Sequence, residues 1–550
     1  MKLRVPDFVG MYFDEEIQNE FENVKTDINC DNGYVKFELN DECLKVFATS
    51  YEDKGVRYIR LRWNEPTRYI DTKILGDTWE RAYGNLQWQS VRPERIMPWY
   101  MIASNGTDSN PDNSNRFTEC FGVGVRPNAM CMWQYDTEGV TLWLDLRNGG
   151  KGTLLGGREI ECATVYFKEY KNISAYSSLK DFLKILSPDP YTTDHVVYGS
   201  NNWYYAYGKS SYEDIISDTK FVKEMCSECE NIPYMVIDDG WQPNPCDAPW
   251  DRGNERFPDM KKLATEMKKI GTRPGIWVRY LVNGRDDEPR KMDNIPEAWY
   301  LQRNKNMLDP SHPEVLNYVK QTTERIVNWG YQLIKHDFST FDIFGDDVLK
   351  PEASIGIWKS EGAGLITNGD WAFYDRTKTS AEIVKNFYKT IKDSAQGTVI
   401  IGCNCIGHLC AGYHQLNRTG DDTSGYEWSR TVRMGVNTLA FRLAQNNSFY
   451  GADADCVGFT GAIDWKYNKE WLKALSCSGT PLFVSCKPYI LNEEQTAELK
   501  KAFKIASEQK DEMIPIDWMD TTTPTRYLIN GKEVKFNWYS PRGNEILNPI

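Results

Sequence analysis

At residues 331–338 the chain reads Tyr-Gln-Leu-Ile-Lys-His-Asp-Phe, a short apolar run that ends on a cation and a carboxylate. A second stretch, residues 414–422, ends in a similar way on Arg418, Asp421 and Asp422. Apolar runs of this length are typical of buried strands. Two strands that each end on an acid beside a base supply what a hydrolase with two catalytic carboxylates requires.

Strand-like and helix-like segments alternate on both sides of these stretches. Helical spacing of apolar residues is clearest in residues 313–329, 379–395, 427–445 and 493–508. The candidate strands are residues 196–205, 232–241, 272–281, 331–338, 398–405, 414–422, 447–455 and 479–487. This alternation predicts a (β/α)8 barrel of the TIM type, although residues 406–413 are too few for a full helix between two of the strands. A doubly wound sheet is the alternative, but residues 201–205 are not the Gly-rich turn that it requires.

Shorter strands are predicted on both sides of the barrel. Residues 35–39, 58–63 and 140–145 alternate between apolar and polar side chains, as in a β-sandwich. Near the C-terminus, strand-like pieces at 526–528 and 534–538 flank an Asn530-Gly531 hairpin turn. We therefore predict a multidomain α/β protein with an N-terminal β-sandwich domain (1–190), a catalytic (β/α)8 barrel (191–508) and a small C-terminal β-domain (509–550).

Composition narrows the partners and the compartment. The 550 residues carry a net charge of −13, which disfavours nucleic acid and anionic membranes, and we find no apolar run of about 18 residues. An aromatic content of 13% suits a carbohydrate ligand, because aromatic faces stack on sugar rings. The start of the chain lacks the pattern of a signal peptide, and the 14 Cys form no dense framework, so we expect a cytoplasmic protein. A removed leader would instead make it secreted or periplasmic.

Charged and aromatic residues gather at the predicted strand ends, where the active site of a barrel lies. They are Trp203, Asp238, Asp239, Trp277, Arg279, Lys335, Asp337, Cys403, Asn404, Arg418, Asp421, Asp422, Asp453 and Asp455. Each residue also has a structural interpretation: Asp337 as a helix cap, Arg418 as half of an ion pair, and Trp203 as core. A site explains all of them together.

A metal site is the competing interpretation for one segment. Its candidate ligands are Cys403, Cys405, His408, Cys410 and His414. Their spacing lacks the usual C-x-x-C knuckle of a zinc site, and the chain has only 5 His. We also find no Gly-rich phosphate loop and no Ser-His-Asp arrangement. We therefore expect no cofactor and no metal.

Residues 196–487 resemble the retaining α-galactosidases of glycoside hydrolase clan D, family 36 more closely than family 27. The stretches that carry the resemblance are 237–241, 257–260, 275–277, 309–310, 334–338, 418–423, 453–455 and 479–483. The resemblance implies that Asp337 is the nucleophile and that Asp422, four residues after an arginine, is the acid/base. It also implies that the substrate is bound by Trp203, Asp238, Asp239, Trp277, Lys335, Cys403, Asn404, Arg418 and Asp455.

In such an enzyme Asp337 is ionised, and Asp422 begins protonated because burial or a negative neighbour raises its pKa. The expected partner is an oligosaccharide or glycoconjugate with a terminal α-galactosyl group. Gly407 is small, which leaves α-N-acetylgalactosaminidase activity open. A galactosyltransferase of the raffinose-synthase type and a silent sugar-binding protein are further alternatives. We expect residues 285–307 and 341–373 to shape the leaving-group side; the oligomeric state is not predicted.

Overall fold

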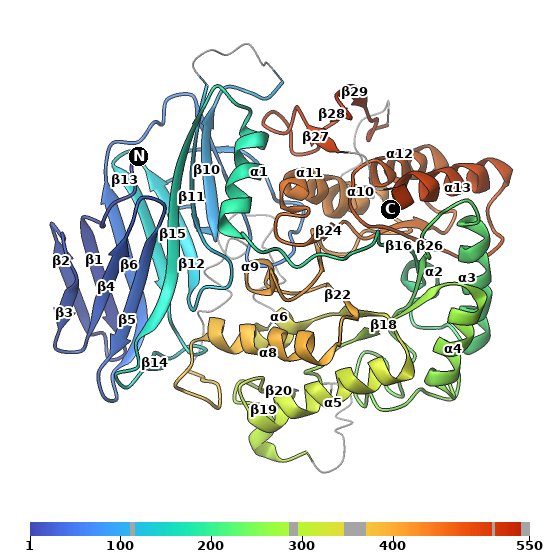
Figure 1. Cartoon of the computed structure of the whole chain (residues 1–550), viewed down its shortest axis with the longest axis horizontal. Coiled ribbons are helices and arrows are strands. Elements are labelled where there is room, and N and C mark those ends of the chain that lie inside the picture. Colours follow the sequence, from blue (N-terminus) through green and yellow to red (C-terminus); the bar gives the residue numbers. More distant parts are fainter. Residues whose placement is uncertain (110–115, 285–294, 346–369, 509–511, 541–550) are drawn as a thin grey trace, which may run out of the picture.

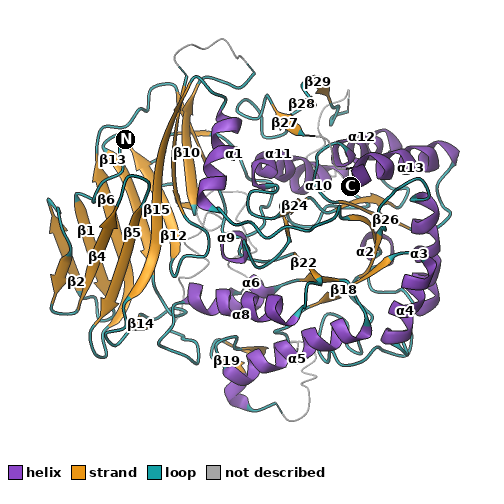
Figure 2. Cartoon of the chain, in the orientation of Figure 1, coloured by secondary structure: helices purple, strands orange, loops and turns teal. Residues whose placement is uncertain are grey.

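The structure is a computed structural model and describes residues 1–109, 116–284, 295–345, 370–508 and 512–540. Figure 1 shows an N-terminal part made of long strands, beside a part in which helices surround shorter strands. Figure 2 separates the two by colour: strands dominate the first part and helices lie on the outside of the second. In the described residues no helix is both long and apolar enough to cross a membrane.

The N-terminal part consists of two antiparallel sheets. Within the described residues one sheet has seven strands, in the order β2-β1-β6-β13-β12-β9 with β14 beside β6, and the other has eight, in the order β3-β4-β5-β15-β11-β10-β7-β8. The bounds are β1 Phe8–Phe13, β2 Gln18–Glu22, β3 Ile28–Cys30, β4 Gly33–Leu39, β5 Leu44–Ser50, β6 Gly55–Asn64, β7 Thr72–Gly76, β8 Gln89–Ser90, β9 Met97–Pro98, β10 Tyr100–Asn105, β11 Phe117–Val123, β12 Met130–Asp136, β13 Gly139–Asp145, β14 Thr153–Leu154 and β15 Ile160–Lys171.

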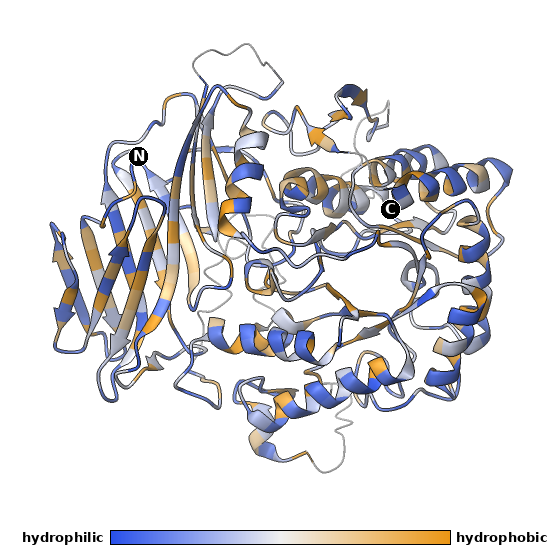
Figure 3. Cartoon of the chain, viewed as in Figure 1, coloured by the Kyte–Doolittle hydropathy of each residue, from blue (hydrophilic) through white to orange (hydrophobic). Residues whose placement is uncertain are grey.

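Alternating side chains build the core of this part. In β6, Ile59, Leu61 and Trp63 are buried, while the residues between them are less buried. The ring of Trp63 lies 6.3 Å from that of Trp133 and 5.0 Å from that of Phe167. Figure 3 shows the resulting alternation of hydrophobic and hydrophilic positions along these strands. The strands predicted at 35–39, 58–63 and 140–145 are confirmed as β4, β6 and β13.

The second part contains a parallel sheet with the order β24-β23-β22-β21-β18-β17-β16-β26-β25. Its strands are β16 Tyr198–Asn201, β17 Tyr234–Ile237, β18 Arg273–Val278, β21 Leu333–His336, β22 Val399–Gly402, β23 Leu416–Arg418, β24 Gly451–Asp453, β25 Cys456–Phe459 and β26 Leu482–Cys486. Each of the predicted barrel strands is confirmed in position, and β25 is an addition. The two edges, β24 and β25, are consecutive in the chain. The closed barrel stays a prediction, because no ladder among the described residues joins them.

Helices and short elements connect these strands. They are α1 Ala175–Leu186, α2 Trp203–Ala206, α3 Tyr212–Met225, α4 Met260–Ile270, η1 Glu297–Trp299, β19 Tyr300–Leu301, β20 Asn304–Leu308, α5 Pro313–Trp329, α6 Ser339–Phe344, α8 Ser380–Ser394, α9 Gly407–Cys410, α10 Trp428–Thr431, η4 Val432–Asn437, α11 Thr438–Arg442, η5 Leu443–Gln445, α12 Trp465–Ser476 and α13 Glu493–Glu508. The helices predicted at 313–329 and 493–508 are confirmed with the same bounds. Pro313 begins α5, and Gly330 ends it in a left-handed conformation with φ 101°.

The helix predicted at residues 427–445 is helical but is not one regular α-helix. Residues 427–445 form α10, a π-helical turn η4, α11 and a 3-10 turn η5 in place of one α-helix. Gly435 lies within the π-helical turn, and a Cβ on it would lie 2.8 Å from the ring of Trp471. Close packing against that ring therefore coincides with the widened turn, a geometry that apolar spacing does not encode.

The C-terminal segment forms a small antiparallel sheet of β27 Met513–Pro515, β28 Arg526–Ile529 and β29 Lys532–Lys535. Asn530 and Gly531 join the last two strands with φ angles of 50° and 74°. The predicted hairpin turn is thereby confirmed, because such turns require positive φ at both positions. The boundaries between the three predicted domains stay a prediction.

Candidate active site

The C-terminal ends of the parallel strands bring most of the predicted site residues to one edge of the sheet. Asn201 ends β16, Asp238 follows β17, Asp337 follows β21, Arg418 ends β23 and Asp453 ends β24. Parallel strands direct their carboxyl ends to the same side, which is the side that carries active sites in barrel enzymes.

Lys335 lies at the centre of this edge and is only 8% exposed. Its Nζ donates to Asp238 Oδ2 at 2.7 Å, and Asn201 Nδ2 donates to the same oxygen at 2.6 Å. Burial by itself lowers the pKa of this amine, but nearby acids raise it well above its usual value; they include Asp238, Asp337 and Asp422. Lys335 is therefore a permanent cation whose field reaches acids on different strands.

Asp337 is held at the end of β21 by contacts to both of its carboxylate oxygens. Trp277 Nε1 donates to Oδ2 at 3.1 Å, and the backbone N–H of Phe338 donates to Oδ1 at 2.7 Å. Arg81 Nη1 lies 4.0 Å from Oδ1. Phe338 has a left-handed φ of 63°, a strained conformation of the kind found at functional sites. The turn thus fixes the orientation of a buried carboxylate.

Arg418 connects two further acids. Its Nη2 lies 2.9 Å from Asp455 Oδ2 and 3.3 Å from Asp422 Oδ1. Asp455 Oδ2 also accepts hydrogen bonds from the backbone of Thr423, at 2.8 Å, and from the hydroxyl of Tyr204. Because Asp455 is occupied by these partners, it anchors Arg418 and has little capacity left for a substrate hydroxyl.

Asp421 and Asp422 differ in how firmly the protein holds them. Asp421 forms two ion pairs, with Arg81 Nη2 at 2.9 Å and with Arg430 Nη2 at 2.8 Å. Asp422 pairs with Arg418, and its side chain is 34% exposed against 19% for Asp421. Asp422 is therefore the more accessible of the two carboxylates to a ligand, while Asp421 is held by two arginines.

The expectation that the pKa of Asp422 is raised is wrong for the ligand-free protein. Burial does act to raise it, but surrounding cations outweigh burial and lower the pKa below its usual value. The cations are Arg418, Lys335, Arg81 and Arg430. Asp422 is consequently ionised in this state, which suits a base, and it must gain a proton before it acts as an acid.

A loop of the N-terminal sheets supplies charged residues that the sequence analysis missed. The loop follows β7, and its Ala82 pairs with the segment after β23: Ala82 N–H donates to the Thr419 carbonyl at 3.0 Å, and the Ala82 carbonyl accepts from Asp421 N–H at 2.9 Å. This pairing brings Arg81 to Asp337 and Asp421.

Glu80, in the same loop, is also buried at the site. Burial raises the pKa of Glu80 to about 7, against the opposing charge of Arg81. Its carboxylate accepts from Tyr83 and from the side chain of Asn404. The one sequence signal for this loop is a charged pair enclosed by Trp79 and Tyr83. Nothing in the sequence indicates that the loop reaches the parallel sheet.

The linked charges around Lys335, Asp337, Arg418 and Arg81 form a charged network. Among the remaining predicted residues, Cys403 belongs to this network and Trp203 lies at its margin. Cys403 Sγ is 3.4 Å from both Arg81 Nη1 and Arg418 Nη1, so this thiol bridges the two arginines. Trp203 is half-buried at the start of α2, with its ring 5.1 Å from that of Tyr207. No polar contact of its side chain is seen in the described residues.

Asn404 and Asp239 are directed away from the network's centre. The Asn404 side chain is completely buried and binds Glu80 and the backbone of residue 341. Asp239 Oδ1 accepts from Gln242 Nε2 at 2.5 Å and from the backbone of Cys246 at 2.8 Å, both in the loop that follows it. In this state both residues shape the wall and leave few free polar atoms.

The candidate zinc ligands that were weighed against the expectation of no metal do not gather into one site. His408 Nε2 bonds to the Val123 carbonyl at 2.7 Å, and its ring stacks on Trp99 at 4.9 Å. Cys405 and His414 do lie together, but the third member of their cluster is His336, which the spacing did not include. The five residues therefore do not act as one set.

Gly407 does not face the charged network. A Cβ at this position would lie 2.8 Å from the hydroxyl of Tyr450 and 3.5 Å from Asn417 Nδ2. Its small size is thus explained by packing against these two residues, and the argument that it makes room for an N-acetyl group loses its basis.

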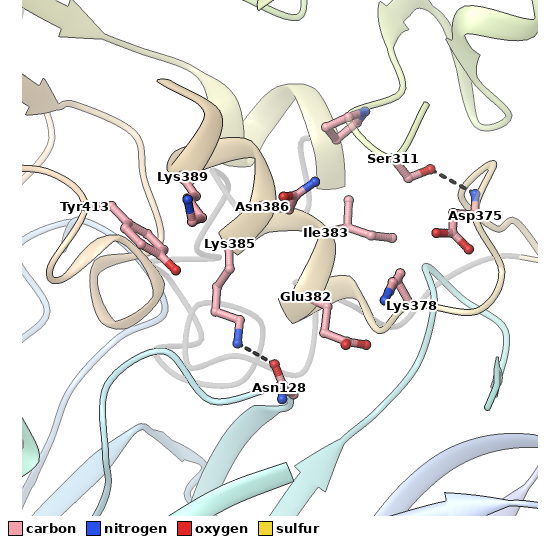
Figure 4. A pocket seen from close by; sticks show the side chains of 11 residues that line it. Asn128, Ser311, Asp375, Lys378, Glu382, Ile383, Lys385, Asn386, Lys389 and Tyr413 are labelled. Atoms are coloured by element: carbon pink, nitrogen blue, oxygen red, sulfur yellow. Dashed lines mark hydrogen bonds between the residues drawn. The ribbon is translucent and has the colours of Figure 1, made fainter. Parts of the chain in front are cut away.

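Of two hollows compared with the site, one lies within it and the other lies away from it. A cavity of about 20 Å³, enough for one water molecule, is lined by residues of the network that include Lys335, Arg418 and Asp455. A larger hollow of about 340 Å³ lies between α8 and the loop at Asn128 (Figure 4). There Lys385 donates to Asn128, and none of the predicted site residues lines the hollow.

Comparison with solved structures supports the same architecture, although no family model and no curated protein matches the sequence. Among solved structures, the α-galactosidase TtGalA from Thermus thermophilus, in complex with p-nitrophenyl α-D-galactopyranoside, has a TM-score of 0.59 at 12% identity, covering 93% of this chain and 99% of that one.

Two other structures have TM-scores of 0.54, each at 12% identity. The family 36 α-galactosidase AgaA from Geobacillus stearothermophilus is matched over 93% of this chain and 77% of its own. A cycloalternan-degrading enzyme from Trueperella pyogenes, in complex with isomaltose, is matched over 98% and 88%. The resemblance to family 36 enzymes is therefore confirmed at the level of the fold.

Proposed function

We propose that this protein is a retaining exo-glycosidase that hydrolyses terminal α-galactosides through a covalent glycosyl-enzyme intermediate. The observation that carries the proposal is that Asp337 and Asp422, which follow different strands, lie in the field of the same two cations, Lys335 and Arg81. Double displacement requires a nucleophile and an acid/base at one anomeric carbon. The fold shared with solved α-galactosidases gives independent support.

In the first step, a carboxylate oxygen of Asp337 attacks the anomeric carbon while the bond to the leaving oxygen breaks. Asp422 donates its proton to that oxygen. In the second step, ionised Asp422 takes a proton from water, the water oxygen attacks the anomeric carbon, and Asp337 is released. The bonds from Trp277 and the Phe338 backbone orient Asp337 for this attack.

The remaining network binds and orients the sugar. Lys335 and Asp238 present a donor and an acceptor side by side, an arrangement that suits adjacent hydroxyl groups. Arg418 is assigned to the 2-position of the sugar, as the family resemblance implies, and its ion pair with Asp455 holds it in place. Because these charges are already paired before a ligand arrives, binding requires little reorganisation.

The leaving group is expected on the side of Asp422. Tyr207 and Tyr426 are 43% and 51% exposed, with their rings 6.0 Å apart. Burial, the phenol of Tyr426 and the charge of Asp422 all raise the pKa of Tyr207, as expected if its hydroxyl lies close to Asp422. Exposed aromatic faces beside a proton donor suit a second sugar ring. Of the segments 285–307 and 341–373, which were predicted to shape this side, residues 285–294 and 346–369 lie outside the described residues.

Chromogenic substrates test the sugar specificity. We expect kcat/KM for p-nitrophenyl α-galactoside to exceed that for the matching α-N-acetylgalactosaminide and α-glucoside. A preference for the N-acetyl sugar would establish the alternative named above, and absence of turnover on each would contradict the glycosidase proposal. Adding a sugar acceptor separates hydrolysis from a transferase of the raffinose-synthase type, because only the transferase forms mainly galactosylated acceptor.

The domain organisation is part of the proposal. We take the parallel sheet as a barrel that closes where β24 passes into β25, since the intervening residues are only Ala454 and Asp455. The sandwich (1–190) then contributes Arg81 to the mouth of the barrel (191–508), and residues 509–550 form the last β-domain.

A further inference from the structure

Behind the charged network, His336, Cys405 and His414 meet in a buried cluster. Their ligand atoms all lie within 4.8 Å of one another, and Cys405 Sγ is 3.6 Å from His336 Nδ1. The three residues come from the end of β21, the loop after β22 and the loop before β23. Each is at most 1% exposed.

The nitrogen atoms of this cluster lack partners. Neither ring nitrogen of His414 and not the Nε2 of His336 has a hydrogen bond within the described residues. An unpaired buried polar atom costs about 1–3 kcal/mol, so such atoms are normally satisfied by water or an ion.

Gly402, the last residue of β22, lets two polar side chains pack close to its backbone. A Cβ on Gly402 would lie 2.5 Å from Asn417 Oδ1 and 2.8 Å from His414 Nδ1, too close for either to stay in place. Asn417 Oδ1 is itself buried without a hydrogen-bond partner. An unpaired oxygen donor therefore lies beside the same glycine as His414 Nδ1.

We propose that His336, Cys405 and His414 bind a zinc ion, with Asn417 Oδ1 or a water molecule as the fourth ligand. Two imidazoles and a thiolate form a donor set that zinc prefers. Zinc bonds of about 2.0–2.3 Å in tetrahedral geometry place donors roughly 3.4–3.8 Å apart, which agrees with the Cys405–His336 contact. The wider pairs must close by about 1 Å on binding. The ion would bind as the chain folds, while the Cys405 thiol can still release its proton to solvent as the zinc–sulfur bond forms.

Such an ion has a structural role. His336 directly precedes Asp337, and the other two ligands lie in the connection between β22 and β23. The metal would therefore tie the end of β21 to that connection behind the site. The rings of Tyr388 and Phe387, from α8, contact His336 and close the cluster from outside. Water and substrate have no direct access to it. The inference is independent of the proposed glycosidase activity.

Metal analysis of the full-length protein tests this inference. Cells grown with zinc should yield protein that retains about one zinc per chain after gel filtration with a chelator. Protein produced in cobalt medium should show a thiolate-to-cobalt charge-transfer band in the near ultraviolet. Wild-type protein that contains less than about a tenth of a metal per chain and lacks this band would overturn the proposal, leaving ordered water as the partner of the histidines.

Variants assign the ligands. Cys405→Ser should lose the metal and the charge-transfer band and lower Tm by about 5 °C or more, because metal binding stabilises the folded state. If Cys405→Ser is insoluble, His414→Gln replaces it and should lose zinc as well. Cys410→Ser is the matched control: Cys410 is buried in α9, contacts the Gly407 carbonyl at 3.3 Å, and lies outside the cluster. Retention of zinc by either cluster variant, or its loss from the control, would contradict the assignment.

Discussion

Lys335 and His336 are neighbours on β21 and face opposite sides of the strand, and their surroundings differ in kind. Lys335 lies among charged residues with partners: its Nζ is 2.7 Å from Asp238, and the nearby Arg418 is 2.9 Å from Asp455. His336 lies among uncharged side chains, and several of their nitrogen and oxygen atoms have no hydrogen-bond partner within the described residues. Paired charges are a preorganised environment for a polar ligand, whereas the unpaired atoms around His336 are the observation from which we infer a zinc ion.

The two sides should respond differently to mutation. We call the charged residues on the Lys335 side the inner network and the cluster around His336 the outer side. Removing one charge from the inner network leaves its partner buried and unpaired, which typically costs several kcal/mol of folding free energy and changes the electrostatic field at the site. Changes on the outer side should affect metal content and stability, with turnover altered only indirectly. The predictions below test the inner side in order of expected effect.

Asp337→Asn should give the largest loss. The amide oxygen can keep only one of the two bonds from Trp277 and the Phe338 backbone, and the amide cannot attack the anomeric carbon, so kcat should fall by roughly a thousandfold or more. Steady-state assays on p-nitrophenyl α-galactoside measure the loss, and Tm should stay within about 3 °C of the wild type. Substantial remaining activity would mean that the inner network is organised around another nucleophile.

Asp422→Asn and Asp421→Asn form a matched pair. Loss of the proton donor should reduce kcat/KM for an oligosaccharide by about 10²–10⁴-fold, and less for a nitrophenyl galactoside, whose leaving group needs little protonation. Asp421→Asn should have a smaller effect that is similar on both substrates, because Asp421 acts through Arg81 and Arg430. The reverse pattern would assign the acid to Asp421.

Arg81→Gln tests whether the sandwich loop belongs to the inner network. Removal of a cation 4.0 Å from Asp337 and paired with Asp421 should lower kcat/KM by about tenfold. Arg62→Gln is the control: Arg62 pairs with Asp136 at 2.6 Å within the sandwich and should leave kcat/KM unchanged. Equal activities of the two variants would reduce the loop to a packing element.

Arg430→Gln should have the smallest effect, which is a shift in the pH dependence of kcat/KM. The acid role requires protonated Asp422, so activity declines as pH rises through its pKa, which cations hold below the usual value. Removing the Arg430 charge raises this pKa and should move the alkaline limb of kcat/KM to higher pH. A limb that stays in place or moves to lower pH would show that another group controls it.

The fold was largely predictable because it rests on local patterns. The apolar runs that became β21 and β23 carry their signal within a few residues, and the helix α5 has Pro313 and Gly330 at its ends. The π-helical turn at Val432–Asn437 was not predictable, because it depends on packing against a distant ring. Local sequence specifies elements well, while distortions within them depend on tertiary contacts.

The site was predictable where it follows a strand and not where it depends on contacts between distant segments. Lys335, Asp337 and Arg418 could be placed because strand ends converge on one edge. Arg81 could not, because it reaches this edge only through the pairing of Ala82 with residues far along the chain. The pKa of Asp422 was predicted in the wrong direction because the combined charge of Arg418, Lys335 and Arg81 outweighs burial, a balance that depends on their distances in the folded protein.

Trapping the intermediate tests the central claim most directly. A slow fluorinated α-galactosyl fluoride should label the protein once, and mass spectrometry of its peptides should locate one fluorogalactosyl group on Asp337. Asp337→Asn should remain unlabelled. A label on a different acid, or turnover that inverts the anomeric configuration without any covalent adduct, would contradict the proposed mechanism.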